Sequence, residues 1–160
     1  MVTNGGVMLL TGTYQRSVDE KLRIAIPKRL RDALGMSLDK GLFITPGTDG
    51  SLALYTEEVL SRLADRLAVA SPTGQEVRAF NRLFFAQAEW AEVDNQGRVR
   101  IPTALAQASG IAGEVVLLGV QDHMELWEQQ RWQEYFQQRL EQYDEIAERA
   151  FSPRKEGGKD

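Results

Sequence analysis

One stretch of this 160-residue chain occurs twice. Residues 19–35, DEKLRIAIPKRLRDALG, align without a gap with residues 94–110, DNQGRVRIPTALAQASG. The copies share, in order, an Asp, an Arg, an Ile, a Pro, a Leu, an Ala and a Gly. So many identities at one offset indicate two copies of one unit. Since half a chain of this length is marginal for an independent core, we expect the two halves to fuse intimately.

The shared residues predict a unit of strand, turn, strand and short helix. An Asp accepts hydrogen bonds from the amides of a turn that follows it, and Gly97 can adopt a left-handed conformation, so residues 94–97 are expected to form a tight hairpin connection. Residues 23–26 and 98–101 alternate as half-buried strands do. A Pro then suits the start of each helix and a Gly its end: Pro27, Pro102, Gly35 and Gly110.

A doubled D-x-x-x-R module, each copy followed by a short strand, Pro, a brief helix and Gly, resembles the MraZ family of bacterial transcriptional regulators. Leu54-Tyr55 and Leu126-Trp127, each before a helix, extend the resemblance from about Met8 to about Phe151. It implies an α+β, mainly β fold. In that fold, two tandem AbrB-like swapped-hairpin units form a pseudo-two-fold β-barrel core with flanking helices. Leu22 departs from the family pattern, which usually has Gly there.

These patterns predict the organisation of the whole chain. We expect a flexible leader at 1–7, a first AbrB-like unit with its helix at 8–70, and a linker and helix at 71–88. A second unit with a C-terminal helix follows at 89–151, and a disordered tail at 152–160. Thr73 and Glu76 suggest a capping box for the middle helix, and apolar spacing predicts one long helix over 130–150.

Charge is distributed unevenly along the chain. The net charge is −4 with a pI of about 5.2, which by itself argues weakly against a polyanionic partner. Residues 16–31, however, hold six basic residues against two acidic ones, a local charge of +4. Residues 134–148 hold five acidic residues against one basic residue, a local charge of −4. One face can therefore be basic while another region is acidic.

The basic residues of the repeats are the candidate DNA contacts. Arg23 and Arg98 can project from the turns toward phosphates or base edges, each oriented by the preceding Asp19 or Asp94. The alternative is an Asp–Arg clamp that only fastens the turn, with Gly97 as a turn-forming residue. Four further residues suit phosphate neutralisation or an ordinary solvated helix face: Lys21, Lys28, Arg29 and Arg31. Because the second copy lacks most of these charges, the first half is expected to supply most of the DNA surface.

Catalysis has little support in the sequence. The chain has no cysteine, and its single histidine, His123, has no partner with which to form a zinc site, so it is expected to be a surface or packing residue. Neighbouring carboxylates on a strand point to opposite faces and suit shared acid–base work poorly. We expect no cofactor, no metal, no small-molecule substrate and no membrane segment.

The resemblance implies a sequence-specific regulator, a repressor of its own division and cell-wall gene cluster that binds short direct repeats of promoter DNA as a homo-oligomeric ring. Such a protein would be cytoplasmic and nucleoid-associated. The alternative is an oligomeric interaction module of the same fold that does not touch DNA, which the low pI favours. Fold similarity alone does not separate the two.

Overall fold

The computed structural model describes residues 9–35, 40–70 and 74–152. It contains two compact units, Met1–Gln129 and Gln130–Asp160, which we describe separately. The predicted leader at 1–7, the tail from 153 onward and the capping residue Thr73 lie outside the described residues. The remaining domain boundaries stay a prediction.

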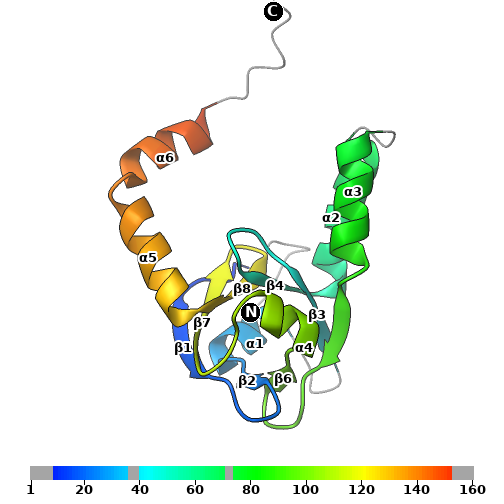
Figure 1. The fold of residues 1–160 in the computed structure, drawn as a ribbon, viewed down its shortest axis with the longest axis vertical. Helices are drawn as coiled ribbons and strands as arrows, with labels where there is room; N and C mark the ends of the chain where they lie inside the picture. The colour runs from blue at the N-terminus through cyan, green and yellow to red at the C-terminus, as the bar shows by residue number, and fades with distance from the viewer. Residues whose placement is uncertain (1–8, 36–39, 71–73, 153–160) are drawn as a thin grey trace, which may run out of the picture. The chain divides into compact units, whose positions relative to one another are not determined.

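The first unit combines short strands with four helices in its described part (Figure 1). The strands are β1 (Thr13–Ser17), β2 (Arg23–Ala25), β3 (Gly41–Pro46), β4 (Leu52–Tyr55), β5 (Glu89–Glu92), β6 (Arg98–Arg100), β7 (Glu114–Val120) and β8 (His123–Glu128). The helices are α1 (Lys28–Leu34), α2 (Glu57–Val69), α3 (Gln75–Phe85) and α4 (Thr103–Ala108).

The strands interleave the two repeats. Six of them form one antiparallel sheet in the order β1-β7-β8-β4-β3-β5, and β2 pairs with β6 in a separate two-stranded ribbon. The counterparts in the two repeats are β1 and β5, β3 and β7, and β4 and β8. Replacing each strand of the six-stranded sheet by its counterpart gives the same order read from the other end. The first strand of each repeat pairs with a strand of the other, β1 with β7 and β5 with β3. The structure is thus α+β with a mainly antiparallel sheet, as predicted.

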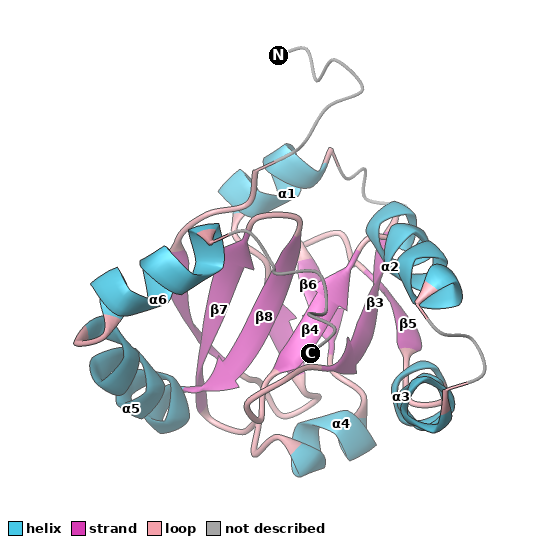
Figure 2. Cartoon of the chain, turned by 90° about the horizontal axis from the view of Figure 1, so that it is seen from above, coloured by secondary structure: helices cyan, strands magenta, loops and turns pink. Residues whose placement is uncertain are grey.

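Helices flank this sheet. Figure 2 shows β7, β8, β4 and β3 in a row, with α2 and α3 beside β3. The hydroxyl of Thr56 accepts a hydrogen bond from the Val59 amide at 3.3 Å, which makes Thr56 the N-cap of α2. Helix α3 begins after Gly74 and has no side-chain cap. The capping box predicted for Thr73 and Glu76 stays a prediction, because Thr73 lies outside the described residues.

The apolar core joins the two repeats. Ile24 of β2 and Val99 of β6 lie directly opposite each other and are 1% and 0% exposed. Two further hydrogen bonds cross between the repeats: the Ile26 amide donates to the Gly97 carbonyl at 2.9 Å, and the Ile101 amide donates to the Leu22 carbonyl at 2.8 Å. Each repeat therefore completes the turn of the other.

The two Asp-initiated turns have matching backbone geometry. Gly97 has φ 77° and Leu22 has φ 60°, so both occupy the left-handed region. The predicted hairpin is wrong in extent, because after one bridge between Val93 and Val99 the strands diverge into different sheets. The turn itself is tight, since the Gly97 amide donates to the Asp94 carbonyl at 2.9 Å.

The second unit contains most of α5 (Gln129–Leu140) and all of α6 (Tyr143–Phe151). The prediction of a single helix over 130–150 is wrong. The Gln142 amide donates to the Arg139 carbonyl at 3.0 Å, three residues back, which tightens the last turn of α5 and ends it. Among the described residues, no helix has the length and apolar character needed to cross a membrane.

Leu22 provides a test of backbone strain. In the left-handed region a residue with a Cβ costs about 1 to 2 kcal/mol, which Gly avoids. Both Leu22→Ala and Leu22→Gly lose the packing of the half-buried side chain on the core, but only Gly relieves the strain. We expect Leu22→Gly to be the more stable of the two by about 1 kcal/mol in thermal or urea melts.

Glu20, an exposed residue of the same turn without positive φ, supplies the control. There, Glu20→Gly should be less stable than Glu20→Ala by about 0.5 kcal/mol. If Leu22→Ala were instead the more stable variant at position 22, the turn would carry no strain at that residue.

Candidate nucleic-acid interface

The two D-x-x-x-R turns are built by the same set of hydrogen bonds. In the first turn, Asp19 Oδ1 accepts from the Lys21 amide at 2.9 Å and from the Arg23 amide at 2.8 Å. Asp19 Oδ2 accepts from Arg23 Nε at 2.8 Å. One carboxylate thereby caps the turn and holds the guanidinium at the start of β2.

The second turn repeats this arrangement. Asp94 Oδ1 accepts from the Gln96 and Arg98 amides, each at 2.9 Å, and Oδ2 accepts from Arg98 Nε at 2.9 Å. The predicted Asp–Arg pairs are therefore formed in both copies. Each pair uses one of the five N–H donors of its guanidinium. Each arginine side chain is 29% exposed, so its terminal amino groups can reach a ligand.

These contacts shift the protonation of the two aspartates. The amide of Arg23 holds the pKa of Asp19 below its ordinary value, with further lowering by the Arg23 guanidinium and the Lys21 amide, while burial opposes the shift. The Arg98 amide and guanidinium and the Gln96 amide lower the pKa of Asp94 in the same way. Both carboxylates are ionised at neutral pH, as an orienting role requires.

The register of β2 and β6 places the arginines on one face. Arg23 lies opposite Arg100, and Ala25 lies opposite Arg98. Residues directly opposite each other, and residues two apart on one strand, share a face of a sheet. Since Ile24 and Val99 point into the core, the three arginines and Ala25 occupy the outer face. Figure 1 shows β2 and β6 side by side, with the turns that precede them looping out at the same end of the unit.

Arg100 was missed at the sequence level. The alternation Arg98-Val99-Arg100 already places residues 98 and 100 on one face of a strand. What the sequence does not show is that this face adjoins Arg23 of the other repeat, because that contact depends on the pairing of β2 with β6.

The remaining basic residues of the first repeat have different surroundings. Lys21, Lys28 and Arg29 are exposed, the first in the turn and the other two in the first turn of α1. Arg31 is half-buried, and its Nε donates to the Ile26 carbonyl at 3.1 Å. A Cβ on Gly97 would lie 2.7 Å from Arg31 Cζ, so the Arg31 side chain packs on the turn of the other repeat.

His123 lies on β8, away from the turns in the chain, and has an environment of its own. Its Nδ1 is 2.8 Å from Asp122 Oδ1, its Nε2 is 3.4 Å from Glu125 Oε2, and its ring stacks on Tyr55 with centroids 5.0 Å apart. Burial opposes the charge of the imidazole, yet the hydrogen bonds and negative charges of Glu125 and Asp122 raise the pKa of His123. The packing role predicted for this histidine agrees with these contacts.

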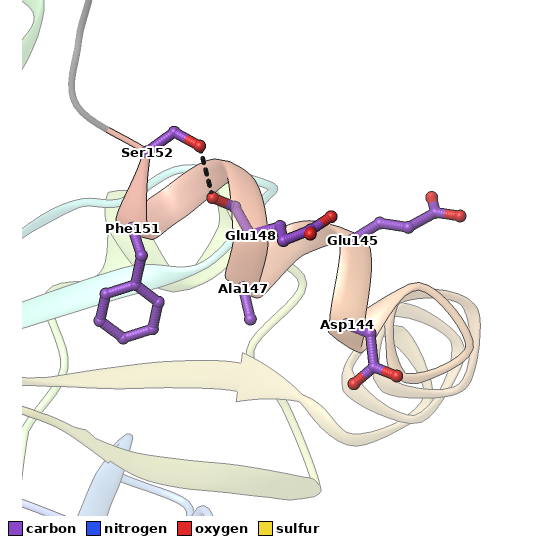
Figure 3. A pocket seen from close by; sticks show the side chains of 6 residues that line it. All are labelled: Asp144, Glu145, Ala147, Glu148, Phe151 and Ser152. Atoms are coloured by element: carbon purple, nitrogen blue, oxygen red, sulfur yellow. Dashed lines mark hydrogen bonds between the residues drawn. The ribbon is translucent and has the colours of Figure 1, made fainter.

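The acidic region of the chain lies in the second unit. Figure 3 shows Asp144, Glu145 and Glu148 on α6, together with the hydrogen bond from Ser152 Oγ to the Glu148 carbonyl at 2.7 Å. These residues line a hollow on α6 with Ala147 and Phe151. Phe151 is 89% exposed, so the hollow is a shallow feature of one helix surface and offers no enclosed ligand site.

The lowered pKa of Asp19 predicts an acid-sensitive turn. A carboxyl group whose pKa is lower in the folded state contributes stability above its unfolded pKa, about 3.9, and loses that contribution as the pH falls through the folded pKa. Asp19→Asn keeps an acceptor oxygen but removes the charge. The difference in melting temperature between the parent chain and Asp19→Asn should therefore be larger at pH 7 than at pH 3. Asp65→Asn, at an exposed position of α2, should show no such change; an equal difference at both pH values would contradict the charge role.

The chain matches proteins of one family over nearly its whole length. The family model described as "MraZ protein, putative antitoxin-like" matches residues 9–83 and again residues 84–153. Similar curated relatives include the "Transcriptional regulator MraZ" of Heliobacterium modesticaldum, 36% identical over 88% of this chain and 96% of that protein. The protein of the same name from Acetivibrio thermocellus is 38% identical over 86% of this chain and 94% of its own length. With a doubled family match and relatives of this similarity over most of both chains, the chain belongs to the MraZ family.

Proposed function

We propose that the protein is a sequence-specific, DNA-binding regulator of transcription. One observation carries the proposal: the β2–β6 ribbon presents Arg23 and Arg98 on one outer face, each with its Nε held by an aspartate. An oriented guanidinium with free terminal amino groups suits bidentate contact with phosphate or guanine. The names of the MraZ relatives, which are transcriptional regulators, support the same function.

The residues divide by role. Arg23 and Arg98 contact DNA directly, and Asp19 and Asp94 orient them, with Gly97 allowing the second turn. Lys21, Lys28 and Arg29 neutralise phosphates, for which their exposure suits them. Arg31 can add to the positive potential, although its Nε is bound to the Ile26 carbonyl.

The finer features of the proposal come from the family resemblance. The protein acts in the cytoplasm, at the nucleoid, as a repressor of its own division and cell-wall gene cluster. It binds short direct repeats of promoter DNA as a homo-oligomeric ring. In each subunit, the sheet and the β2–β6 ribbon act together as a pseudo-two-fold barrel that supports the turns.

An oligomeric interaction module that does not bind DNA is the second candidate. The net charge of −4 favours it, as do apolar side chains exposed on α5 and α6, where Phe136 is 47%, Leu140 53% and Tyr143 65% exposed. Exposed apolar surface of this kind is typical of protein contacts. Both candidates can assemble, so only DNA binding distinguishes them.

Titration of the protein with its own upstream DNA tests the proposal. Arg23→Ala should weaken binding by about 1 to 3 kcal/mol, the range for an arginine that reads a base or clamps a phosphate. Arg98→Ala should cost less, because its own repeat carries fewer basic residues than the first. Fluorescence anisotropy with the upstream duplex, and with a scrambled duplex of equal length, measures both effects.

Arg62→Ala, at an exposed position of α2, is the matched control and should leave binding unchanged. Particle size by light scattering should stay the same in all three variants, and the melting temperature should stay nearly unchanged. Equal affinity of the parent chain for the two duplexes would remove sequence specificity from the proposal. An Arg23→Ala protein that unfolds would favour the purely structural clamp.

The number of DNA repeats tests the ring. Several identical turns held in one particle can engage consecutive repeats, and linked sites can raise affinity by roughly 10² to 10⁴ without new contacts. Duplexes with two or three repeats should therefore bind far more tightly than a duplex with one, and the advantage should shrink as salt rises. Anisotropy against each duplex, with light scattering of the free protein, decides this. A monomer, or an affinity independent of repeat number, would contradict the ring.

A further inference from the structure

We infer that Arg16 and Arg100 are two further DNA contacts, one from each repeat, that supply equivalent guanidinium groups from non-equivalent sequence positions. This inference rests on the proposed DNA-binding function and extends it. It also changes the expected division of the DNA surface between the two repeats. The second repeat contributes Arg100, a cation that the first repeat lacks at the aligned position, Ala25.

The repeat alignment pairs Arg16 with Ala91 and Ala25 with Arg100. The strand registers agree: Arg16 lies opposite Val115 where β1 pairs with β7, and Ala91 lies opposite Leu42 where β5 pairs with β3. Each repeat thus has one arginine and one alanine at these two places, in opposite order. The first repeat carries its arginine on its first strand, and the second carries it on the ribbon.

Arg16 reaches the ribbon from β1. Its Nε donates to the Ala25 carbonyl at 3.0 Å and its Nη1 donates to the Gln15 carbonyl at 2.7 Å. Its Cζ lies 5.9 Å from the centre of the Tyr14 ring. These contacts hold the guanidinium beside Ala25, the residue that faces Arg98, and leave N–H donors available.

Arg100 occupies the related position in the second repeat. It is exposed on the outer face of β6, opposite Arg23. It lines a surface hollow together with Ala91, its small partner on β5, as well as Glu89 and Glu92. Neither carboxylate forms an ion pair with Arg100 within the part of the chain that the structure describes.

Four guanidinium groups therefore lie on the ribbon or beside it. At one end Arg16 lies beside Ala25, which faces Arg98, and at the other Arg100 faces Arg23. Arg23 and Arg98 are each paired with an aspartate, whereas Arg16 binds neutral carbonyls and has no carboxylate partner among the described residues. Uncompensated, planar cations next to two oriented arginines suit the phosphates on either side of the bases that Arg23 and Arg98 would contact.

The test measures affinity and salt dependence for the upstream duplex. Arg100→Ala and Arg16→Ala should each weaken binding about tenfold and lower the slope of log affinity against log salt by about one, as expected for one lost phosphate contact. The loss should be similar on the scrambled duplex, since phosphate contacts carry no sequence information. Melting temperature and particle size should match those of the parent chain.

Relocation of the arginine makes the test specific. Ala25 is exposed and is the repeat equivalent of Arg100, so Arg16→Ala with Ala25→Arg moves the guanidinium to the arrangement of the second repeat. This double variant should recover most of the affinity lost in Arg16→Ala. Arg16→Ala with Gln138→Arg restores the same net charge at an exposed position of α5 and should recover none of it.

The outcomes separate this inference from the proposed function. If the parent chain binds and Arg23→Ala weakens binding while Arg16→Ala and Arg100→Ala do not, the inference alone is overturned. Equal recovery by Ala25→Arg and Gln138→Arg would show that only net charge matters, and would overturn it too. If the parent chain does not bind the duplex, the proposed function fails and this inference fails with it. Should Arg16→Ala unfold, Arg100→Ala decides the matter by itself.

Discussion

The pairing of β2 with β6 is the contact on which the rest of the structure depends. Each strand has three residues, too few for a stable strand without partners. Their pairing brings Ile24 against Val99 at the centre of a core that both repeats share. It also places Arg23, Arg98 and Arg100 together on the outer face. One short ribbon therefore stabilises the fusion of the halves and assembles the candidate interface.

The differences between the repeats make physical sense in this arrangement. Gly97 in the turn of the second repeat lies under the Arg31 side chain, which comes from the helix of the first repeat. In the repeat alignment Leu22 corresponds to Gly97, and Ala106 corresponds to Arg31. A small turn residue is thus matched with a large helix residue in one pair, and a large turn residue with a small helix residue in the other. Arg16 with Ala25, and Ala91 with Arg100, show the same exchange. Since the strands of the two copies interleave, a gain of side-chain volume in one copy can be offset by a loss in the other.

Local sequence determined the elements and the chemistry of the turns. The positions of Asp and Arg in the motif predicted the paired Asp19–Arg23 and Asp94–Arg98 contacts, because these groups meet through hydrogen bonds within five consecutive residues. The alternation around Ile24 and Val99 predicted which residues are buried. The capping role of Thr56 follows equally from its neighbours. Such features depend on short-range geometry, which residue type and spacing specify.

Tertiary structure decided what depends on pairing between distant strands. The sequence shows two repeats but not that β1 and β5 exchange partners, so the hairpin expected around residues 94–97 reduces to a single bridge. Arg100 joins Arg23, and Arg31 packs on Gly97, only because the repeats interleave. The sequence likewise did not predict that α5 ends before α6, since the apolar spacing continues through the break. The break is visible only in the backbone, where the Gln142 amide bonds to the Arg139 carbonyl three residues back. Periodicity specifies which face of an element is apolar, but the partner of that face is chosen by the folded chain as a whole.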